Sequence, residues 1–81
     1  MTSYCSKTLV SELKRRRKKN PSYSLRKFAK DLSIDPGYLS RVLRDERAMS
    51  LDMVYRVGRK LFSKEKDIMS FVDGVYRSKN L

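Results

Sequence analysis

Apolar residues recur along this chain at the three- and four-residue spacing of helices, and no segment alternates as a strand does. A stripe that begins at Leu9 predicts a helix over residues 7–19. This helix ends before Pro21, because a residue that precedes proline avoids the helical region. Two shorter stripes predict helices over residues 25–32 and 36–44.

Residues that favour helix N-caps stand directly before three of the stripes: Ser24, Asp35 and Ser50. Pro36 takes the first position of its helix, where proline is favoured. Ser50 begins a fourth helix, and Gly58 within its apolar stripe indicates close approach of another helix. A fifth helix is predicted over residues 63–78. The fold expected is all-α, a compact five-helix bundle that forms a single domain over residues 1–81.

Composition and charge add a candidate partner. Hydrophobic residues make up 40% of the chain, more than a disordered polybasic tail carries. Twenty Lys and Arg against nine Asp and Glu give a net charge of +11, and residues 1–50 hold thirteen of the basic side chains. This excess indicates an anionic partner, nucleic acid in preference to an acidic membrane surface.

The chain lacks the side chains that most catalytic and metal sites need. It has no His and a single Cys, Cys5, which excludes an imidazole base and a zinc site. No nucleophile–base pair and no glycine-rich phosphate loop is present, so we expect neither an enzyme nor a cofactor. No apolar run approaches the ~20 residues of a membrane span, and the first ten residues lack a secretory signal. We expect a cytoplasmic protein at the nucleoid, without a second domain for a small-molecule effector.

Residues 25–44 carry the most specific pattern. Two short helices are joined by a turn too tight for an antiparallel hairpin, which sets the second helix across the first. Ala29 is small where the helices would touch, and Ile34 supplies an apolar residue in the turn. The remaining positions expected to be buried are Phe28, Leu32, Leu39 and Val42. The pattern predicts a helix-turn-helix, whose second helix projects from the body toward a major groove.

The run SLRKFAKDLSIDPGYLSRVLRDERAMSLDMVYRVGRKL, residues 24–61, resembles the lambda-repressor-like, or Cro-type, family of DNA-binding domains. The segment is also similar to NPxYSLRxFAxxL, found at the N-terminus of a group of uncharacterised, longer bacterial proteins. Two departures stand out. Ser33 lies where the family usually has glycine, and Asp45–Glu46 lies where it often has one. At Ser33 a positive φ would carry a conformational cost.

The resemblance implies that helix 36–44 reads DNA in the major groove, while helix 25–32 lies across the backbone. Arg41 is the favoured reader, because its guanidinium can bind guanine O6 and N7 together. The base-contact candidates are Pro36, Gly37, Tyr38, Ser40, Arg41 and Arg44. The phosphate-contact candidates are Ser24, Lys27 and Arg47, with Lys14, Arg16 and Lys18 from the basic end of the first helix. In the family the helix after the motif often pairs subunits, and the corresponding candidates here are Ile68, Phe71, Val72 and Val75.

Each assignment has an ordinary alternative. Arg41 and Arg44 can be solvated surface charges, and Tyr38 can be partly buried against its own helix. The cations of residues 14–19 can form a solvated helix end, and helix 63–78 can complete the core instead of pairing subunits. The function predicted is sequence-specific binding of double-stranded DNA by a homodimeric bacterial or phage transcriptional regulator. The alternatives are a helix-turn-helix adaptor for protein or RNA and a low-specificity, nucleoid-associated DNA binder.

Overall fold

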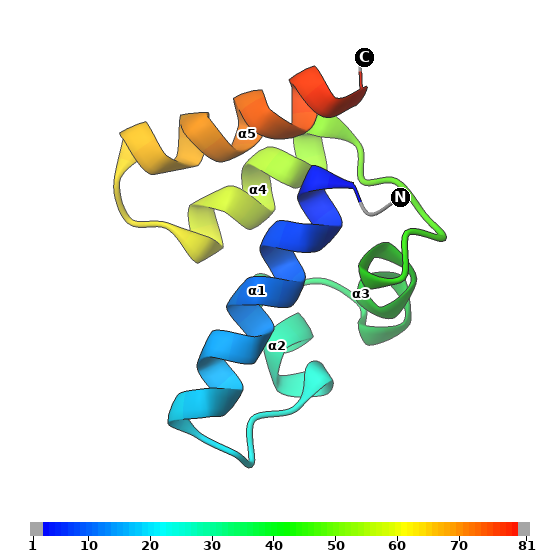
Figure 1. Cartoon of the computed structure of the whole chain (residues 1–81), viewed down its shortest axis with the longest axis vertical. Coiled ribbons are helices and arrows are strands. Elements are labelled where there is room, and N and C mark those ends of the chain that lie inside the picture. The colour runs from blue at the N-terminus through cyan, green and yellow to red at the C-terminus, as the bar shows by residue number, and fades with distance from the viewer. Residues whose placement is uncertain (1–2, 80–81) are drawn as a thin grey trace.

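The computed structural model describes residues 3–79, and every regular element in that range is a helix (Figure 1). The helices are α1 (Tyr4–Lys19), α2 (Leu25–Leu32), α3 (Pro36–Leu43), α4 (Leu51–Leu61) and α5 (Glu65–Lys79). The predicted all-helical fold is confirmed. The largest difference from the sequence prediction is at α1, which begins at Tyr4 rather than at residue 7.

The three predicted N-caps are confirmed. The Ser24 hydroxyl oxygen accepts the Lys27 N–H at 3.1 Å, and the Asp35 carboxylate accepts the Tyr38 N–H at 3.0 Å. The Ser50 hydroxyl oxygen accepts the backbone N–H three residues on at 3.2 Å. Each bond satisfies an N–H that the helix leaves without a partner, so the start of each helix follows from local sequence.

The early start of α1 joins it to the end of α3. Ser3 caps α1 by accepting the Ser6 N–H at 3.1 Å, and its own N–H donates to the Asp45 carboxylate at 2.8 Å. The Ser6 hydroxyl is fully buried and donates to the Leu43 carbonyl oxygen at 2.8 Å. These bonds span about forty residues of sequence, which is why local reasoning missed them. They fix the C-terminal end of α3 against the body.

All five helices contribute to one core. In Figure 1, α4 and α5 lie side by side at one end, α1 crosses the molecule, and α2 and α3 lie toward the other end. The largest fully buried side chains include Leu9, Phe28, Leu39, Val54, Val57 and Phe71. The close approach predicted at Gly58 is confirmed, since a Cβ there would lie 3.1 Å from Phe71 Cδ2. The core therefore holds α3 from one side through Leu39.

α2 and α3 end in the same way, with a non-glycine residue in the left-handed region. Ser33 and Asp45 both have φ 60°. After each, the next N–H reaches back five residues: Ile34 donates to the Ala29 carbonyl and Glu46 to the Arg41 carbonyl, both at 2.9 Å. This is the Schellman pattern, in which glycine is the usual residue. Because both residues carry a Cβ, the backbone keeps each turn at a conformational cost.

Replacing Ser33 with glycine should therefore raise the free energy of unfolding by about 1 kcal/mol, because glycine adopts this φ without a Cβ penalty. The Ser33 side chain is exposed and makes no hydrogen bond within residues 3–79, so little is lost. Urea unfolding measures the change. The control is Ser22→Gly in the exposed turn before α2, where φ is not positive and glycine should give no gain. Equal effects of the two substitutions would contradict the prediction.

Candidate nucleic-acid interface

α3 turns one face to the core and the opposite face to solvent. Leu39 is fully buried and Val42 is 2% exposed, which anchors the helix. The outer face is fully or partly exposed and holds five of the predicted base-contact residues: Pro36, Gly37, Ser40, Arg41 and Arg44. The helical spacing predicted Gly37, Ser40, Arg41 and Arg44 on this side, and the structure exposes them fully or in part. The outer face offers one hydroxyl and two guanidinium groups as side-chain donors.

The two arginines on the outer face of α3 differ in their surroundings. Arg44 Nε lies 3.4 Å from a Glu46 carboxylate oxygen, with both side chains more than half exposed. Arg41 is exposed and has no ion-pair partner among the residues that the structure describes. Of the two arginines, Arg41 is therefore the one whose charge is not paired with a carboxylate among the described residues. A pair as exposed as Arg44–Glu46 is weak, so Arg44 can exchange its partner for a phosphate or a base.

α2 supplies several cations beside the first turn of α3. The Ser24 hydroxyl caps the helix, and Lys27 Nζ lies 3.6 Å from an Asp31 carboxylate oxygen. A hollow on this side is lined by three cationic residues, with Ile34 and Pro36 from the turn and α3: Arg26, Lys27 and Lys30. Lys27 was predicted as a phosphate contact, whereas Arg26 and Lys30 were not. Their spacing on the polar face of α2 was the available signal.

The loop before α4 brings Arg47 against α3. Its guanidinium carbon lies 5.4 Å from the centroid of the Tyr38 ring. Tyr38 is half-buried and packs against the core, so the alternative of partial burial holds for this residue. Tyr38 is therefore less available to a base edge than Arg41 is.

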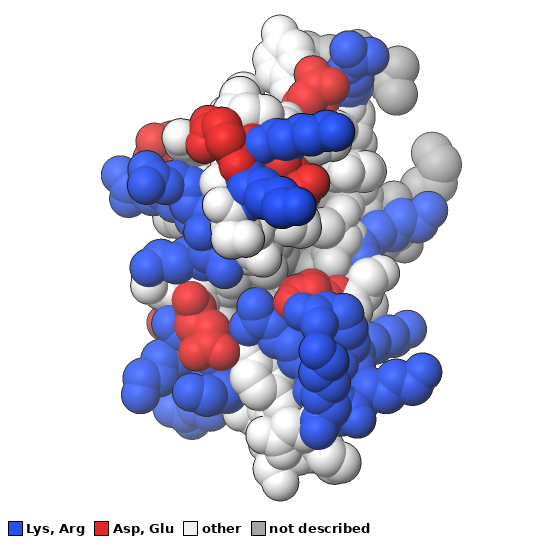
Figure 2. Space-filling view, turned by 90° about the vertical axis from the view of Figure 1, so that its left-hand side faces the viewer, with Lys and Arg blue, Asp and Glu red and all other residues white. Residues whose placement is uncertain are grey.

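The basic end of α1 contains two different kinds of cation. Lys14 and Lys18 are exposed, and neither forms an ion pair anywhere in residues 3–79. Figure 2 shows Lys and Arg side chains gathered over this end of the molecule, with few carboxylates among them. Both lysines are therefore accessible for contact with a phosphate.

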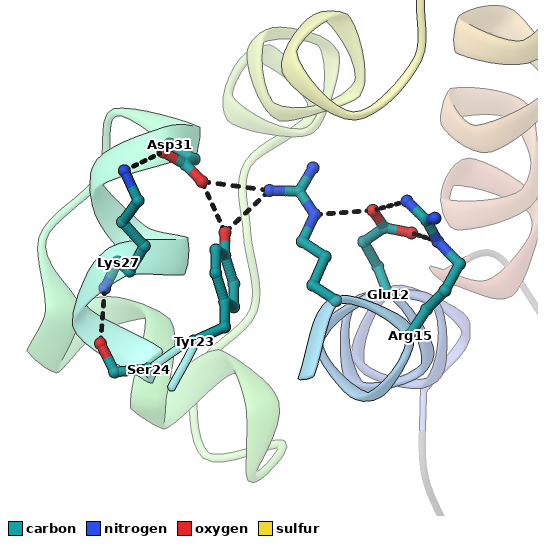
Figure 3. A network of polar contacts seen from close by, with 7 residues as sticks. Glu12, Arg15, Tyr23, Ser24, Lys27 and Asp31 are labelled. Atoms are coloured by element: carbon teal, nitrogen blue, oxygen red, sulfur yellow. Dashed lines mark hydrogen bonds and ion pairs between the residues drawn. The ribbon is translucent and has the colours of Figure 1, made fainter. Parts of the chain in front are cut away.

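Arg16 lies instead inside a polar network between α1 and α2 (Figure 3), and the prediction that it contacts phosphate needs correction. Its Nε lies 2.7 Å from a Glu12 oxygen, and its Nη1 donates to Tyr23 Oη at 2.8 Å and to Asp31 at 3.3 Å. The Tyr23 hydroxyl donates to the same Asp31 oxygen at 2.6 Å. The side chain is only 22% exposed, and the guanidinium lies 5.2 Å from the centroid of the Phe28 ring.

The network shifts the pKa values of its members so that Glu12, Asp31 and Arg16 are favoured in their charged forms and Tyr23 in its neutral form. The hydrogen bond from Arg15, with a further one from Arg16, lowers the pKa of Glu12 below its ordinary value despite partial burial. The Tyr23 hydroxyl lowers the pKa of Asp31 in the same way. Burial, with the hydrogen bond to Asp31, raises the pKa of Tyr23. Burial opposes the charge on Arg16, but its bonds to Glu12 and Tyr23 outweigh this and raise its pKa.

Glu12→Gln should lower the free energy of unfolding at pH 7 by about 1 kcal/mol. Because folding lowers the pKa of Glu12, its contribution is present above the ordinary value of 4.5 and is lost as the pH falls through the folded value. The difference between wild type and variant should therefore shrink in acid. Urea unfolding at pH 7 and pH 3 measures this difference. The control is Asp73→Asn, because Asp73 forms an exposed ion pair with Arg77. An equal gap at both pH values would contradict this assignment.

The face of α5 that was predicted to pair subunits is occupied by the core of the same chain. Ile68 is 5% exposed, and Phe71 and Val75 are each 2% exposed. Val72 is half-buried and packs against the same cluster. The prediction of a dimer interface through these four residues is therefore corrected: the stripe completes the core, because α4 and α1 already cover it. The exposed apolar residues of α5 are Met69 and Tyr76.

No group of three or more Cys, Asp or Glu side chains within residues 3–79 is placed to hold a metal ion. In the same range, no helix has both the length and the apolar character required to cross a bilayer.

Comparison with protein-family models, curated proteins and solved structures gives no match to this chain.

Proposed function

We propose that this protein binds double-stranded DNA sequence-specifically, as a bacterial or phage transcriptional regulator acting at the nucleoid. In this proposal α2, residues 33–35 and α3 act as a helix-turn-helix, with α3 in the major groove. The observation that carries the proposal is the position of α3. It is anchored through Leu39 and Val42 and presents Arg41 outward with no carboxylate partner among the described residues.

The shape of the motif supports this proposal. The turn between α2 and α3 is three residues long and is fixed by the backbone bond from Ile34 to Ala29. α1 ties the far end of α3 through the Ser6–Leu43 hydrogen bond, so the helix is held at both ends. A reading helix requires such rigidity, because base contacts demand a fixed register against the duplex.

The distribution of charge also supports the proposal. Exposed cations lie near the first turn of α3 and at a second place on the surface: Arg26 and Lys30 on α2 line a hollow with Pro36, and Lys14 and Lys18 stand at the basic end of α1. Side chains of this kind neutralise phosphates and release counterions, which supplies affinity without sequence preference. Arg41 is the residue that adds preference for a base, through a bidentate contact with guanine.

Selection of bound sequences from a random duplex library tests the proposal directly. The expected result is a short enriched motif that contains at least one guanine, bound with an affinity that falls steeply with salt. Recovery of duplexes without a motif would assign the protein to low-specificity, nucleoid-associated binders. No duplex affinity at low salt would contradict the proposal and leave the adaptor for protein or RNA.

The same selection tests the homodimer that forms part of the proposal. A dimer should select two inverted copies of the motif about one helical turn apart, whereas a monomer should select one copy. Sedimentation of the chain with and without the selected duplex measures the stoichiometry. The buried stripe of α5 takes no part in this dimer, since it lies in the core of the single chain.

A further inference from the structure

Tyr38 and Arg47 form a stacked pair at the edge of the reading helix. Tyr38 is the third residue of α3, and Arg47 lies in the loop that leads to α4. The guanidinium carbon stands 5.4 Å from the ring centroid, within the range of a cation–π contact. The Tyr38 ring is itself held, because it packs against the core and its N–H donates to the Asp35 cap at 3.0 Å.

A hollow opens beside this pair, between the first turn of α3 and the start of α4. Tyr38 and Arg47 line one part of it, and the rest includes Ile34, Ala48, Ser50 and Met53. The carboxylate that also lines it, Asp35, is engaged as the cap of α3. Arg47 lines the same hollow and forms no ion pair with Asp35 or with any other carboxylate within residues 3–79.

We propose that Tyr38 is a positioning residue that holds Arg47 over this hollow, so that Arg47 binds a phosphate of the DNA backbone. The inference rests on the proposed function and deepens it, since it replaces the predicted base contact of Tyr38 with an indirect role. A guanidinium that is already stacked on a ring loses less conformational entropy when it binds a phosphate. The contact uses the face of the ring and not the hydroxyl, so phenylalanine serves in place of Tyr38.

A double-mutant cycle on the selected duplex tests the pair. Arg47→Ala should weaken binding roughly tenfold for all sequences and lower the salt slope by about one counterion. Tyr38→Ala should have a similar effect, and the double variant should be little weaker than either single one. Tyr38→Phe should bind as the wild type does. Tyr55→Ala is the matched control, because Tyr55 carries the comparable Arg59 stack on α4 at 5.8 Å.

Nuclear magnetic resonance of the free chain provides the second measurement. The ring current of Tyr38 should shift the Arg47 Nε–H proton, and this shift should persist in Tyr38→Phe and vanish in Tyr38→Ala. Thermal unfolding verifies that each variant is folded. Independent, multiplying losses from Tyr38→Ala and Arg47→Ala would overturn the inference, and so would weak binding by Tyr38→Phe.

The two proposals fail in different ways. If the wild type binds no duplex at low salt, the proposed function is wrong and the phosphate role of Arg47 falls with it. If the wild type binds and Tyr38→Ala binds equally well, the proposed function stands and the positioning role is wrong.

Discussion

Replacing Arg16 with alanine should lower the free energy of unfolding by about 2 kcal/mol, which is about 10 °C in Tm for a domain of this size. The guanidinium is 22% exposed and bridges Glu12 on α1 to Tyr23 and Asp31 at α2. Its removal leaves a half-buried tyrosine hydroxyl with one partner fewer and takes the guanidinium away from the Phe28 ring. Urea and thermal unfolding measure the loss.

Two variants separate the causes of that loss. Arg16→Met keeps a long apolar side chain at this position but removes the charge, while Glu12 keeps Arg15 and Asp31 keeps Lys27. It should therefore recover about half of the lost stability. Lys18→Ala, two residues further along the same basic run, should change stability by less than about 0.5 kcal/mol. If Arg16→Ala and Lys18→Ala unfold at the same urea concentration, the network does not stabilise the fold.

Arg41→Ala should weaken binding of the selected duplex by about 1–3 kcal/mol for each half-site and relax the base preference at one position. Arg41 is the exposed α3 cation that has no carboxylate partner in residues 3–79. Arg41 can therefore make a bidentate contact with guanine without breaking an ion pair within residues 3–79. Competition with single-base variants of the selected duplex measures both effects.

The controls distinguish reading of bases from attraction to phosphate. Lys14→Ala should weaken all duplexes about equally and reduce the salt slope, without changing the motif. Arg77→Ala removes a cation that is paired with Asp73 on α5 at 2.8 Å, and it should leave the DNA affinity unchanged. An unaltered motif for Arg41→Ala would show that the reading residue lies elsewhere.

Much of the local structure could be predicted because its causes lie within a few residues. A cap and its partner are three residues apart, as for Ser24 and Lys27, so the sequence alone fixes where the helix starts. The division of α3 into a buried and an exposed face follows from 100° steps along the helix. The resemblance to the lambda-repressor-like family pointed to a left-handed residue at Ser33, because the family usually has glycine there, and Ser33 has φ 60°.

The candidate site could be predicted only in part. The exposure of Arg41, Lys14 and Lys18 followed from helical periodicity. The partial burial of Arg16 in a polar network could not be predicted in this way, because its partner Asp31 lies fifteen residues away on another helix. The same limit applies to Arg47, whose stack on Tyr38 depends on how the loop after α3 folds back.

The sequence by itself determined the presence of five helices, the caps of α2, α3 and α4, and the basic character of the first half of the chain, since each is a property of neighbouring residues or of composition. Tertiary structure decided which of those cations are available. It drew Arg16 into a polar network, placed Arg47 on Tyr38, and buried the α5 stripe of Ile68, Phe71 and Val75 in the core. The physical reason is that burial and pairing depend on groups from distant segments, and only their packing in three dimensions sets those distances.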